Sequence, residues 1–205
     1  MKLPRPPLLV ITDRKLAGRP LPEVIEAACA AGCRWIMLRE KDLPVPDLEA
    51  LARTLTGIAR PWEAKLVING NLEAAAACGA AGAHLPQGHS VLAARARLGA
   101  KALIGASAHD EPEAMAAAEA GADYVTLSPV FESVSKPGYG PALGLAGLQE
   151  KAERLSIPVV ALGGITAANA AACRQAGAAG VAVLGTVMAA ERPGLEVAKL
   201  LEGIG

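Results

Sequence analysis

The sequence contains very few aromatic residues and no excess charge of either sign. One Phe, two Tyr and two Trp occur in 205 residues, and 20 basic residues balance 20 acidic ones. With too few rings to stack on bases and no basic excess to neutralise phosphates, we expect no nucleic-acid partner. Apolar runs are far shorter than a membrane span, and residues 1–10 lack a signal-peptide pattern. We therefore expect no membrane association and a cytoplasmic location.

Cysteine is also scarce, with four residues at positions 29, 33, 78 and 173. Only Cys29 and Cys33 lie close together in the chain, whereas a zinc site needs two clustered pairs of ligands. We therefore expect the four thiols to be buried by packing and to bind no metal.

Apolar residues, by contrast, are abundant and make up 52% of the chain. Such a chain can bury a large core, which excludes disorder as its main state. Single cores grow to roughly 200–250 residues before a chain divides into domains. We therefore expect one domain over residues 1–205.

One pattern occurs four times: an alanine-rich stretch, an Ala-Gly pair and an apolar run. The copies span residues 26–38, 73–85, 115–127 and 171–184. Alanine favours helix, and glycine readily ends a helix in the left-handed conformation. Helices are therefore expected to stop at Gly32, Gly82, Gly121 and Gly177. Each copy predicts a helix that packs closely on the strand after it.

Further strands are predicted from short, continuous apolar runs between these copies. The predicted strands are residues 8–12, 34–39, 65–69, 82–85, 102–107, 122–127, 157–162 and 180–184, with helices near residues 21–31, 46–59, 71–79, 90–98, 111–120, 144–154, 166–176 and 194–203. Continuous apolar strands are typical of a parallel sheet covered on both faces. Eight βα units in this length predict an α/β fold, a compact (β/α)8 TIM barrel. A doubly wound sheet is the alternative, but no G-x-G-x-x-G follows the first strand.

In such a barrel the functional site lies at the carboxyl ends of the strands. Polar residues occur at several of these ends: Asp13, Arg39, Glu40, Lys41, Asn69, His84, Ser107 and His109. Gly163, Gly164 and Gly185 follow strands seven and eight, where they free backbone amides to approach an anion. This favours a phosphorylated small molecule as the ligand, although the same glycines also suit tight turns. The loop 128–144 is expected to bind or cover the ligand, with Lys136 within reach of a phosphate.

Together these residues resemble one known family, thiamin phosphate synthase and its TenI-type relatives, which are compact (β/α)8 barrels of thiamin biosynthesis. The resemblance covers nearly the whole chain. It rests on VITD (10–13), MLREKD (37–42), LVING (66–70), GAHLPQGHS (82–90), IGASAHD (104–110), ADYVTLSPVFESVSK (122–136), PVVALGGIT (158–166) and GVAVLGTV (180–187). The set in this order is highly specific, although each motif alone is weak.

The synthase branch implies that a pyrimidine diphosphate is joined to a thiazole phosphate, with Mg²⁺ assisting the release of diphosphate. Under this resemblance Arg39 and Lys41 match the basic pair that binds diphosphate. The other matching positions are Asn69 and Ser107 for substrate, Ser133 and Lys136 in the loop after strand six, and Gly164, Leu184 and Gly185, beside Gly163, for the thiazole phosphate.

Besides Ser133, which stands where threonine is usual, three positions depart from the synthase pattern. Gly70 and His89 replace the two aspartates that hold Mg²⁺, and neither supplies the hard oxygen ligands that Mg²⁺ prefers. Met37 replaces a glutamine that contacts the pyrimidine. We therefore expect no metal or other cofactor, with Mg²⁺ needed only if the chain is a synthase.

The Asn-Gly pair at 69–70 and the Leu-Pro-x-Gly run at 85–88 are instead similar to the TenI type. That branch includes a tautomerase that moves a proton on a thiazole phosphate, which requires an acid/base group but no metal. The histidine of that branch near the end of strand six is replaced here by Pro129. The candidate catalytic residues are therefore His84, Lys41 and His109, with His84 favoured because it ends a strand.

Three hypotheses follow for the function. The preferred one is a TenI-type enzyme that acts on a thiazole phosphate without a metal. The alternatives are a divergent thiamin phosphate synthase and a regulatory barrel that binds a thiazole or thiamin phosphate without catalysis. In each case the expected partner is a small phosphorylated thiazole, and assembly into a homo-oligomer remains open.

Overall fold

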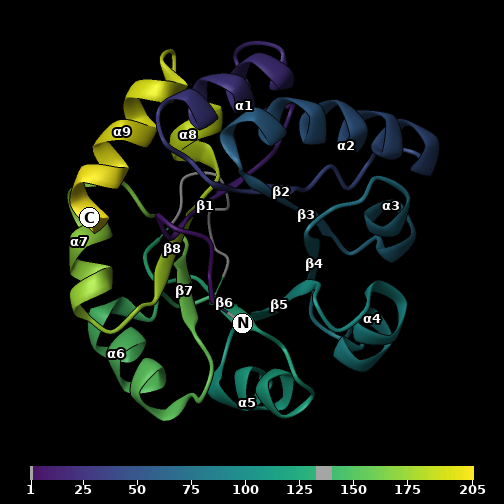
Figure 1. Cartoon of the computed structure of the whole chain (residues 1–205). Coiled ribbons are helices and arrows are strands. Elements are labelled where there is room, and N and C mark those ends of the chain that lie inside the picture. The colour runs from purple at the N-terminus through teal and green to yellow at the C-terminus, as the bar shows by residue number, and fades with distance from the viewer. Residues whose placement is uncertain (1, 133–139) are drawn as a thin grey trace.

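The computed structural model describes residues 2–132 and 140–205. Eight parallel strands form a closed barrel in chain order, and β8 closes it by pairing with β1 (Figure 1). The strands are β1 (Leu8–Ile11), β2 (Trp35–Leu38), β3 (Lys65–Asn69), β4 (Gly82–Leu85), β5 (Leu103–Ala108), β6 (Tyr124–Leu127), β7 (Val159–Leu162) and β8 (Gly180–Val183). The predicted (β/α)8 barrel is confirmed, and the doubly wound alternative is excluded.

Helices surround the barrel on its outside (Figure 1). They are α1 (Leu21–Ala30), α2 (Val45–Ala59), α3 (Leu72–Ala77), α4 (Val91–Leu98), α5 (Glu111–Glu119), α6 (Gly144–Arg154), α7 (Ala167–Gln175), α8 (Gly185–Met188) and α9 (Pro193–Ile204). All eight predicted helices are present, but the predicted set lacks the short α8 and the 3₁₀ turn η1 (Arg60–Trp62). None of the helices in this described part of the chain has the length and apolar character that crossing a membrane requires.

Apolar side chains fill two separate volumes, one inside the barrel and one between the barrel and its helices. In β1 the side chains alternate, because Leu9 and Ile11 belong to the inner cluster and Leu8 and Val10 to the outer one. Both faces of the strand are therefore buried, which explains why the strands are continuous apolar runs. Trp35 and Tyr124 are the largest interior side chains, and their ring centroids lie 4.8 Å apart.

The glycines of the repeated pattern have two different roles. Gly32, Gly121 and Gly177 have φ of 106°, 90° and 87°, so these three predicted helix stops are confirmed. The prediction for Gly82 is wrong, because α3 ends at Ala77 and Gly79, with φ of 64°, makes the turn. Gly82 begins β4, where a Cβ atom would lie 1.9 Å from the carbonyl oxygen of Leu103. It is required by the close approach of a neighbouring strand.

The cysteines are packing residues in most positions. Cys29, Cys33 and Cys173 are buried as predicted, whereas Cys78 is only partly buried, and all four thiols are free. Burial raises the pKa of each thiol above its ordinary value. Reactive cysteines have the opposite shift, so these thiols are suited to packing.

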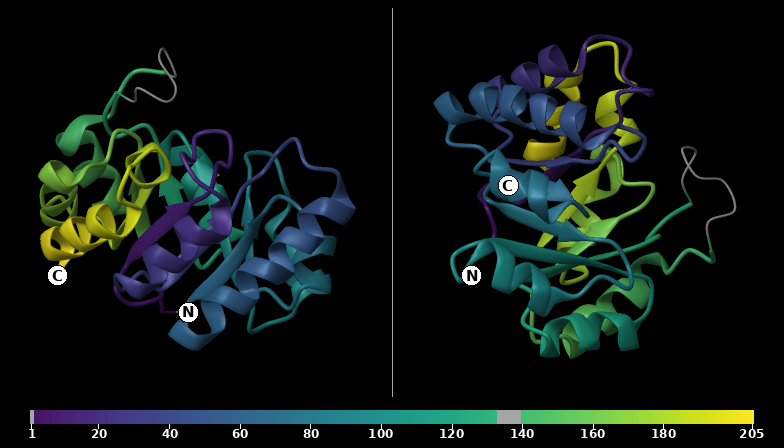
Figure 2. Two further views of the ribbon diagram at one scale, coloured as in Figure 1. Left: turned by 90° about the horizontal axis from the view of Figure 1, so that it is seen from above. Right: turned by 90° about the vertical axis from the view of Figure 1, so that its right-hand side faces the viewer.

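The two ends of the chain lie away from the carboxyl ends of the strands (Figure 2). Both termini lie on the side of the barrel away from the chain that follows β6 (Figure 2). That chain leaves its strand at the carboxyl end, as do the loops after the other strands. The mouth formed by these carboxyl ends is where a barrel of this kind holds its functional residues.

Candidate active site

Strand register brings polar residues from different parts of the sequence to the barrel mouth. Arg39 follows β2 directly, and Asn69 is the last residue of β3. Asn69 is in register with His84 of β4, and Ser107 of β5 is in register with Thr126 of β6. Parallel strands in a closed barrel end on the same face, so this part of the predicted site comes together.

His84 lies in the barrel interior, where it is 2% exposed. Its Nδ1 is 3.1 Å from the hydroxyl of Tyr124, and its Nε2 is 3.0 Å from Ser107 Oγ and 3.3 Å from Thr126 Oγ1. Burial lowers the pKa of His84 to about 3, so the ring is neutral at pH 7. These contacts suit a residue that holds Ser107 in place. The proton-transfer role expected for His84 stays a prediction.

His109 lies just beyond β5, between the ends of β5 and β6. Its Nδ1 is 2.9 Å from the carbonyl oxygen of Ser128, so Nδ1 must carry the hydrogen of this contact. Its backbone N–H donates to Glu113 Oε2 at 2.8 Å, which ties the loop to α5. The side chain is half-buried, and a role in proton transfer remains a prediction.

Two glycines with positive φ follow β7. Gly163 and Gly164 have φ of 100° and 63°, a conformation that favours glycine. The chain after β6 also packs directly on them, since Phe131 N–H donates to the carbonyl of Gly163 at 3.1 Å. A Cβ atom at Gly164 would lie 2.4 Å from the carbonyl oxygen of Glu132. These glycines are therefore needed for loop packing, in addition to any ligand they bind.

Leu184 and Gly185 form the turn from β8 into α8. The carbonyl of Leu184 accepts hydrogen bonds from Val187 and Met188, which closes this single helical turn. Thr186 Oγ1 donates to the carbonyl of Ile165 at 2.6 Å and so joins the loops after β7 and β8. Gly185 also borders an open groove of about 440 Å³ between α8 and the start of α9. Phosphate binding at this turn stays a prediction.

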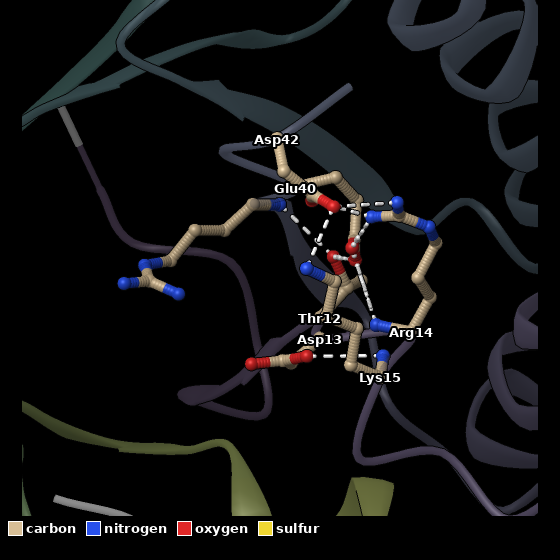
Figure 3. A network of polar contacts seen from close by, with 7 residues as sticks. Thr12, Asp13, Arg14, Lys15, Glu40 and Asp42 are labelled. Carbon is tan, nitrogen blue, oxygen red and sulfur yellow. Dashed lines mark hydrogen bonds and ion pairs between the residues drawn. The ribbon is translucent and has the colours of Figure 1, made fainter.

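An ion-pair network joins the loops after β1 and β2 (Figure 3). Arg14 makes two parallel bonds to the carboxylate of Asp42, at 2.7 and 2.8 Å, and its Nη1 also lies 3.0 Å from Glu40 Oε2. Lys15 Nζ is 2.8 Å from Asp42. The two cations hold the pKa of Asp42 well below its usual range. Arg14 in turn has a pKa above its ordinary value, because both carboxylates bond to it.

The basic pair predicted for diphosphate binding lies in this loop. Arg39 N–H donates to Thr12 Oγ1 at 2.9 Å, and the Thr12 hydroxyl donates to Glu40 at 2.7 Å. Across residues 2–132 and 140–205, neither Arg39 nor Lys41 forms a salt bridge. Both cations are thus available for an anionic ligand.

The residues at the positions expected to hold Mg²⁺ do not fit that ion. Gly70 has no side-chain ligand, and His89 is exposed, with its ring 3.4 Å from the carbonyl of Gln87. The part of the chain that the structure describes contains no group of three or more His, Cys, Asp or Glu side chains placed to hold a metal. Mg²⁺ prefers carboxylate oxygens. We therefore assign no step of the chemistry to a protein-bound metal.

Some predicted residues are not positioned by the structure, and some residues of the site were not predicted. Ser133 and Lys136 lie outside the described residues, so their roles stay predictions. Arg14 and Tyr124 were not predicted as parts of the site, whereas Glu40 was predicted only as one of the polar residues at a strand end. For Glu40 the signal was the alternation of charges directly after a strand, in R-E-K-D at 39–42, a run that does not include Arg14.

Comparison with known proteins places the chain in a family. A family model described as thiamine monophosphate synthase matches residues 8–187. A thiamine-phosphate synthase from Methanoculleus marisnigri is 43% identical over 183 residues, which cover 88% of this chain and 87% of that protein. One from Roseiflexus sp. (strain RS-1) is 39% identical over 187 residues, 90% of this chain and 79% of that protein.

A solved structure supports the same assignment. Thiamine phosphate pyrophosphorylase from Pyrococcus furiosus superposes with a TM-score of 0.87 and 31% identity, over 96% of this chain and 94% of that one. The two curated relatives carry the synthase name, and the family match does not separate the TenI type from the synthase type. The chain therefore belongs to the thiamine monophosphate synthase family.

Proposed function

We propose that the protein is a thiamine-phosphate synthase, which joins a pyrimidine diphosphate to a thiazole phosphate and releases diphosphate. The observation that carries this proposal is that two different kinds of group suited to an anion lie after separate strands of one barrel. Arg39 and Lys41 offer positive charge after β2, whereas Gly163 and Gly164 offer backbone amides after β7. A coupling reaction needs a separate place for each of two phosphorylated substrates, and the names of the relatives agree with it.

In this reaction negative charge develops on the leaving diphosphate, which we place beside the basic residues after β2. The thiazole nitrogen forms a bond to the methylene carbon of the pyrimidine, and the bond from that carbon to diphosphate oxygen breaks. The electron pair leaves with the diphosphate, so negative charge grows there in the transition state. Cations fixed in advance stabilise such charge best. We assign this task to Arg39 and Lys41, and the anchoring of the thiazole phosphate to Gly164, Leu184 and Gly185.

A second candidate function is proton transfer on a thiazole phosphate, as in the TenI type. Gly70 and His89 favour it, because they do not supply the carboxylates implied for a synthase. It requires an acid/base group near the thiazole, and the proposed groups are Lys41, His84 and His109. The buried, neutral ring of His84 makes it the weakest of the three in this role. The names of the relatives move our proposal from this function, which the sequence favours, to the synthase.

The deciding experiment supplies both substrates. Purified protein is incubated with the pyrimidine diphosphate, the thiazole phosphate and Mg²⁺, and both thiamine phosphate and diphosphate are measured. We expect the two products in equal amounts. Exchange of a thiazole proton with D₂O, in the absence of any coupling, would instead establish the TenI-type function. Calorimetric binding of thiazole phosphate with neither reaction would establish the regulatory barrel.

A further inference from the structure

The loop after β2 carries four charges that alternate in sign, Arg39-Glu40-Lys41-Asp42. Left to pair among themselves, these side chains would cancel locally and leave no cation for a ligand. The structure gives both carboxylates partners from a different loop, the one after β1. Arg14 and Lys15 bond to Glu40 and Asp42, so the cations of residues 39 and 41 stay unpaired within the described chain.

Both carboxylate oxygens of Glu40 accept hydrogen bonds from residues of the loop after β1. Oε1 accepts from Thr12 Oγ1 at 2.7 Å and from the Arg14 N–H at 3.1 Å, and Oε2 accepts from Arg14 Nη1 at 3.0 Å. The residue is 6% exposed, so little of the carboxylate is left for another cation. A buried carboxylate needs such partners, since an uncompensated charge is costly away from water.

Asp42 is the more exposed of the two carboxylates, and Arg14 binds it in a bidentate manner, with one hydrogen bond to each carboxylate oxygen. A planar guanidinium matches a carboxylate with two parallel bonds, which fix direction as well as distance. Figure 3 shows the head group of Arg14 turned toward both Asp42 and Glu40. Arg14 thus spans the only two acidic residues of the segment 39–42.

We propose that Arg14 is a positioning residue that sorts these charges: by occupying Glu40 and Asp42, it keeps Arg39 and Lys41 available for a diphosphate-bearing substrate. This inference rests on the proposed function, because it names what prepares the basic side of the same site. Without Arg14, Asp42 keeps Lys15 at Oδ2, but its Oδ1 loses its partner and becomes an internal competitor for Lys41 or Arg39. Thr12 also belongs to this arrangement, because its hydroxyl donates to Glu40 and accepts from the backbone N–H of Arg39.

The test uses inorganic pyrophosphate as the probe and calorimetry as the measurement. Arg14→Gln should weaken pyrophosphate binding by about tenfold or more, because among the described residues Glu40 loses its cationic partner and Asp42 keeps only Lys15 beside the basic pair. Adding Asp42→Asn to that variant should restore binding to within about threefold of the original protein, since the internal competitor is removed. If Arg14 contacted the anion itself, the second change would not restore binding. Rescue is therefore the decisive result.

A matched control removes an ion pair that also has two bonds but joins two helices on the outside of the barrel (Figure 1). Arg97 makes two bonds to Glu73 between α4 and α3, at 2.8 and 2.6 Å. Arg97→Gln should leave pyrophosphate binding unchanged. In turnover, Arg14→Gln should raise the KM for the pyrimidine diphosphate and leave that for the thiazole phosphate unchanged, a split that a general loss of folding would not produce.

Arg39→Gln separates the failure of this inference from the failure of the proposed function. Loss of pyrophosphate binding in Arg39→Gln, with unchanged binding in Arg14→Gln, would overturn the charge sorting alone. Unchanged binding in Arg39→Gln would overturn the diphosphate site itself. If Arg14→Gln does not fold, Arg14→Lys can be used, because it keeps a positive charge beside Glu40 but cannot form the bidentate pair of hydrogen bonds with Asp42. It should then show a loss of about threefold that Asp42→Asn reverses, and no loss would overturn the proposal.

Discussion

The two sides of the barrel mouth present themselves to an anion in different ways. After β2, Arg39 and Lys41 offer full charges on long side chains, and a network of ion pairs keeps their acidic neighbours occupied. After β7, Gly163 and Gly164 offer no side chain at all, and the chain after β6 packs against them. The first side should therefore depend on charge and salt, whereas the second should depend on shape.

The largest effect is expected on the glycine side. Gly164→Val should abolish measurable binding of thiazole phosphate and lower the free energy of unfolding by about 3–4 kcal/mol. A Cβ atom there would lie 2.4 Å from the Glu132 carbonyl oxygen, and φ is 63°. Thermal unfolding and calorimetry measure the two quantities. Unchanged affinity in a folded Gly164→Val protein would place the phosphate elsewhere.

Gly121 provides the control for backbone strain. It has φ of 90°, but a Cβ atom added there would meet no atom of the described residues within 4 Å. It also makes the turn after α5, away from the mouth. Gly121→Val should cost about 1–2 kcal/mol of stability and leave ligand binding unchanged. Equal effects of the two substitutions on binding would remove the distinction between the two sides of the mouth.

The next effect concerns His84, which belongs to neither side. Its folded-state pKa of about 3 lies below the ordinary value of 6.5, so the unfolded chain takes up a proton first as the pH falls. Stability from the neutral ring is complete above pH 6.5 and decreases from there toward pH 3. Between pH 6.5 and 4.5 this amounts to about 2–3 kcal/mol.

Denaturant unfolding at a series of pH values measures this loss. His84→Gln should flatten the dependence over that range, even though it lowers stability overall by removing contacts to Tyr124 and Ser107. His89→Gln, a change in an exposed side chain, should keep the original dependence. A steep acid loss that persists in His84→Gln would assign it to other groups.

Salt concentration should change the affinity for ligands differently on the two sides of the mouth, although by less than the substitutions above. Raising the KCl concentration from about 0.05 to about 0.5 M should weaken pyrophosphate binding about fivefold, because exposed charges are screened. Binding of thiazole phosphate should fall by only about twofold, since fixed backbone amides in a packed turn hold it. Calorimetric titrations at several salt concentrations give both slopes. Equal slopes would contradict the assignment of side-chain charge to one side and backbone to the other.

The smallest effect on binding is expected for Met37→Gln. Met37 is 2% exposed and belongs to the cluster inside the barrel with Leu9 and Ile11. Thiazole phosphate affinity should stay within about twofold, whereas stability should fall by about 1–3 kcal/mol, because an amide is buried among apolar side chains. A large loss of affinity, measured by calorimetry, would extend the thiazole site to the β2 side of the mouth.

Most of the fold could be predicted from the sequence, because its signals are local. A strand buried on both faces must be a continuous apolar run, and every predicted strand and helix was found. The error at Gly82 shows the limit. A glycine that ends a helix and a glycine that admits a neighbouring strand look the same in the chain, and only the 1.9 Å approach of Leu103 separates them.

The site was predictable in its location but less so in its geometry. The sequence placed His84 at a strand end, yet both faces of a barrel strand are buried, so the side-chain pattern does not tell which residues point inward. The structure puts its ring under the mouth, among hydroxyl groups of β5 and β6. The role of Gly164 in packing against Glu132 likewise depends on a contact between loops that are distant in sequence.

Reading the chain alone shows that four alternating charges follow a buried strand, and this places them at the barrel mouth. How those charges pair depends on the folded arrangement of the loops. Ile11 and Met37 are in register in adjacent strands, and this brings Arg14 beside Glu40 and Asp42, which are 26 and 28 residues away. Ion pairs form between the charges that the folded backbone holds closest, so nearness in the sequence alone does not set which cations remain available to a ligand.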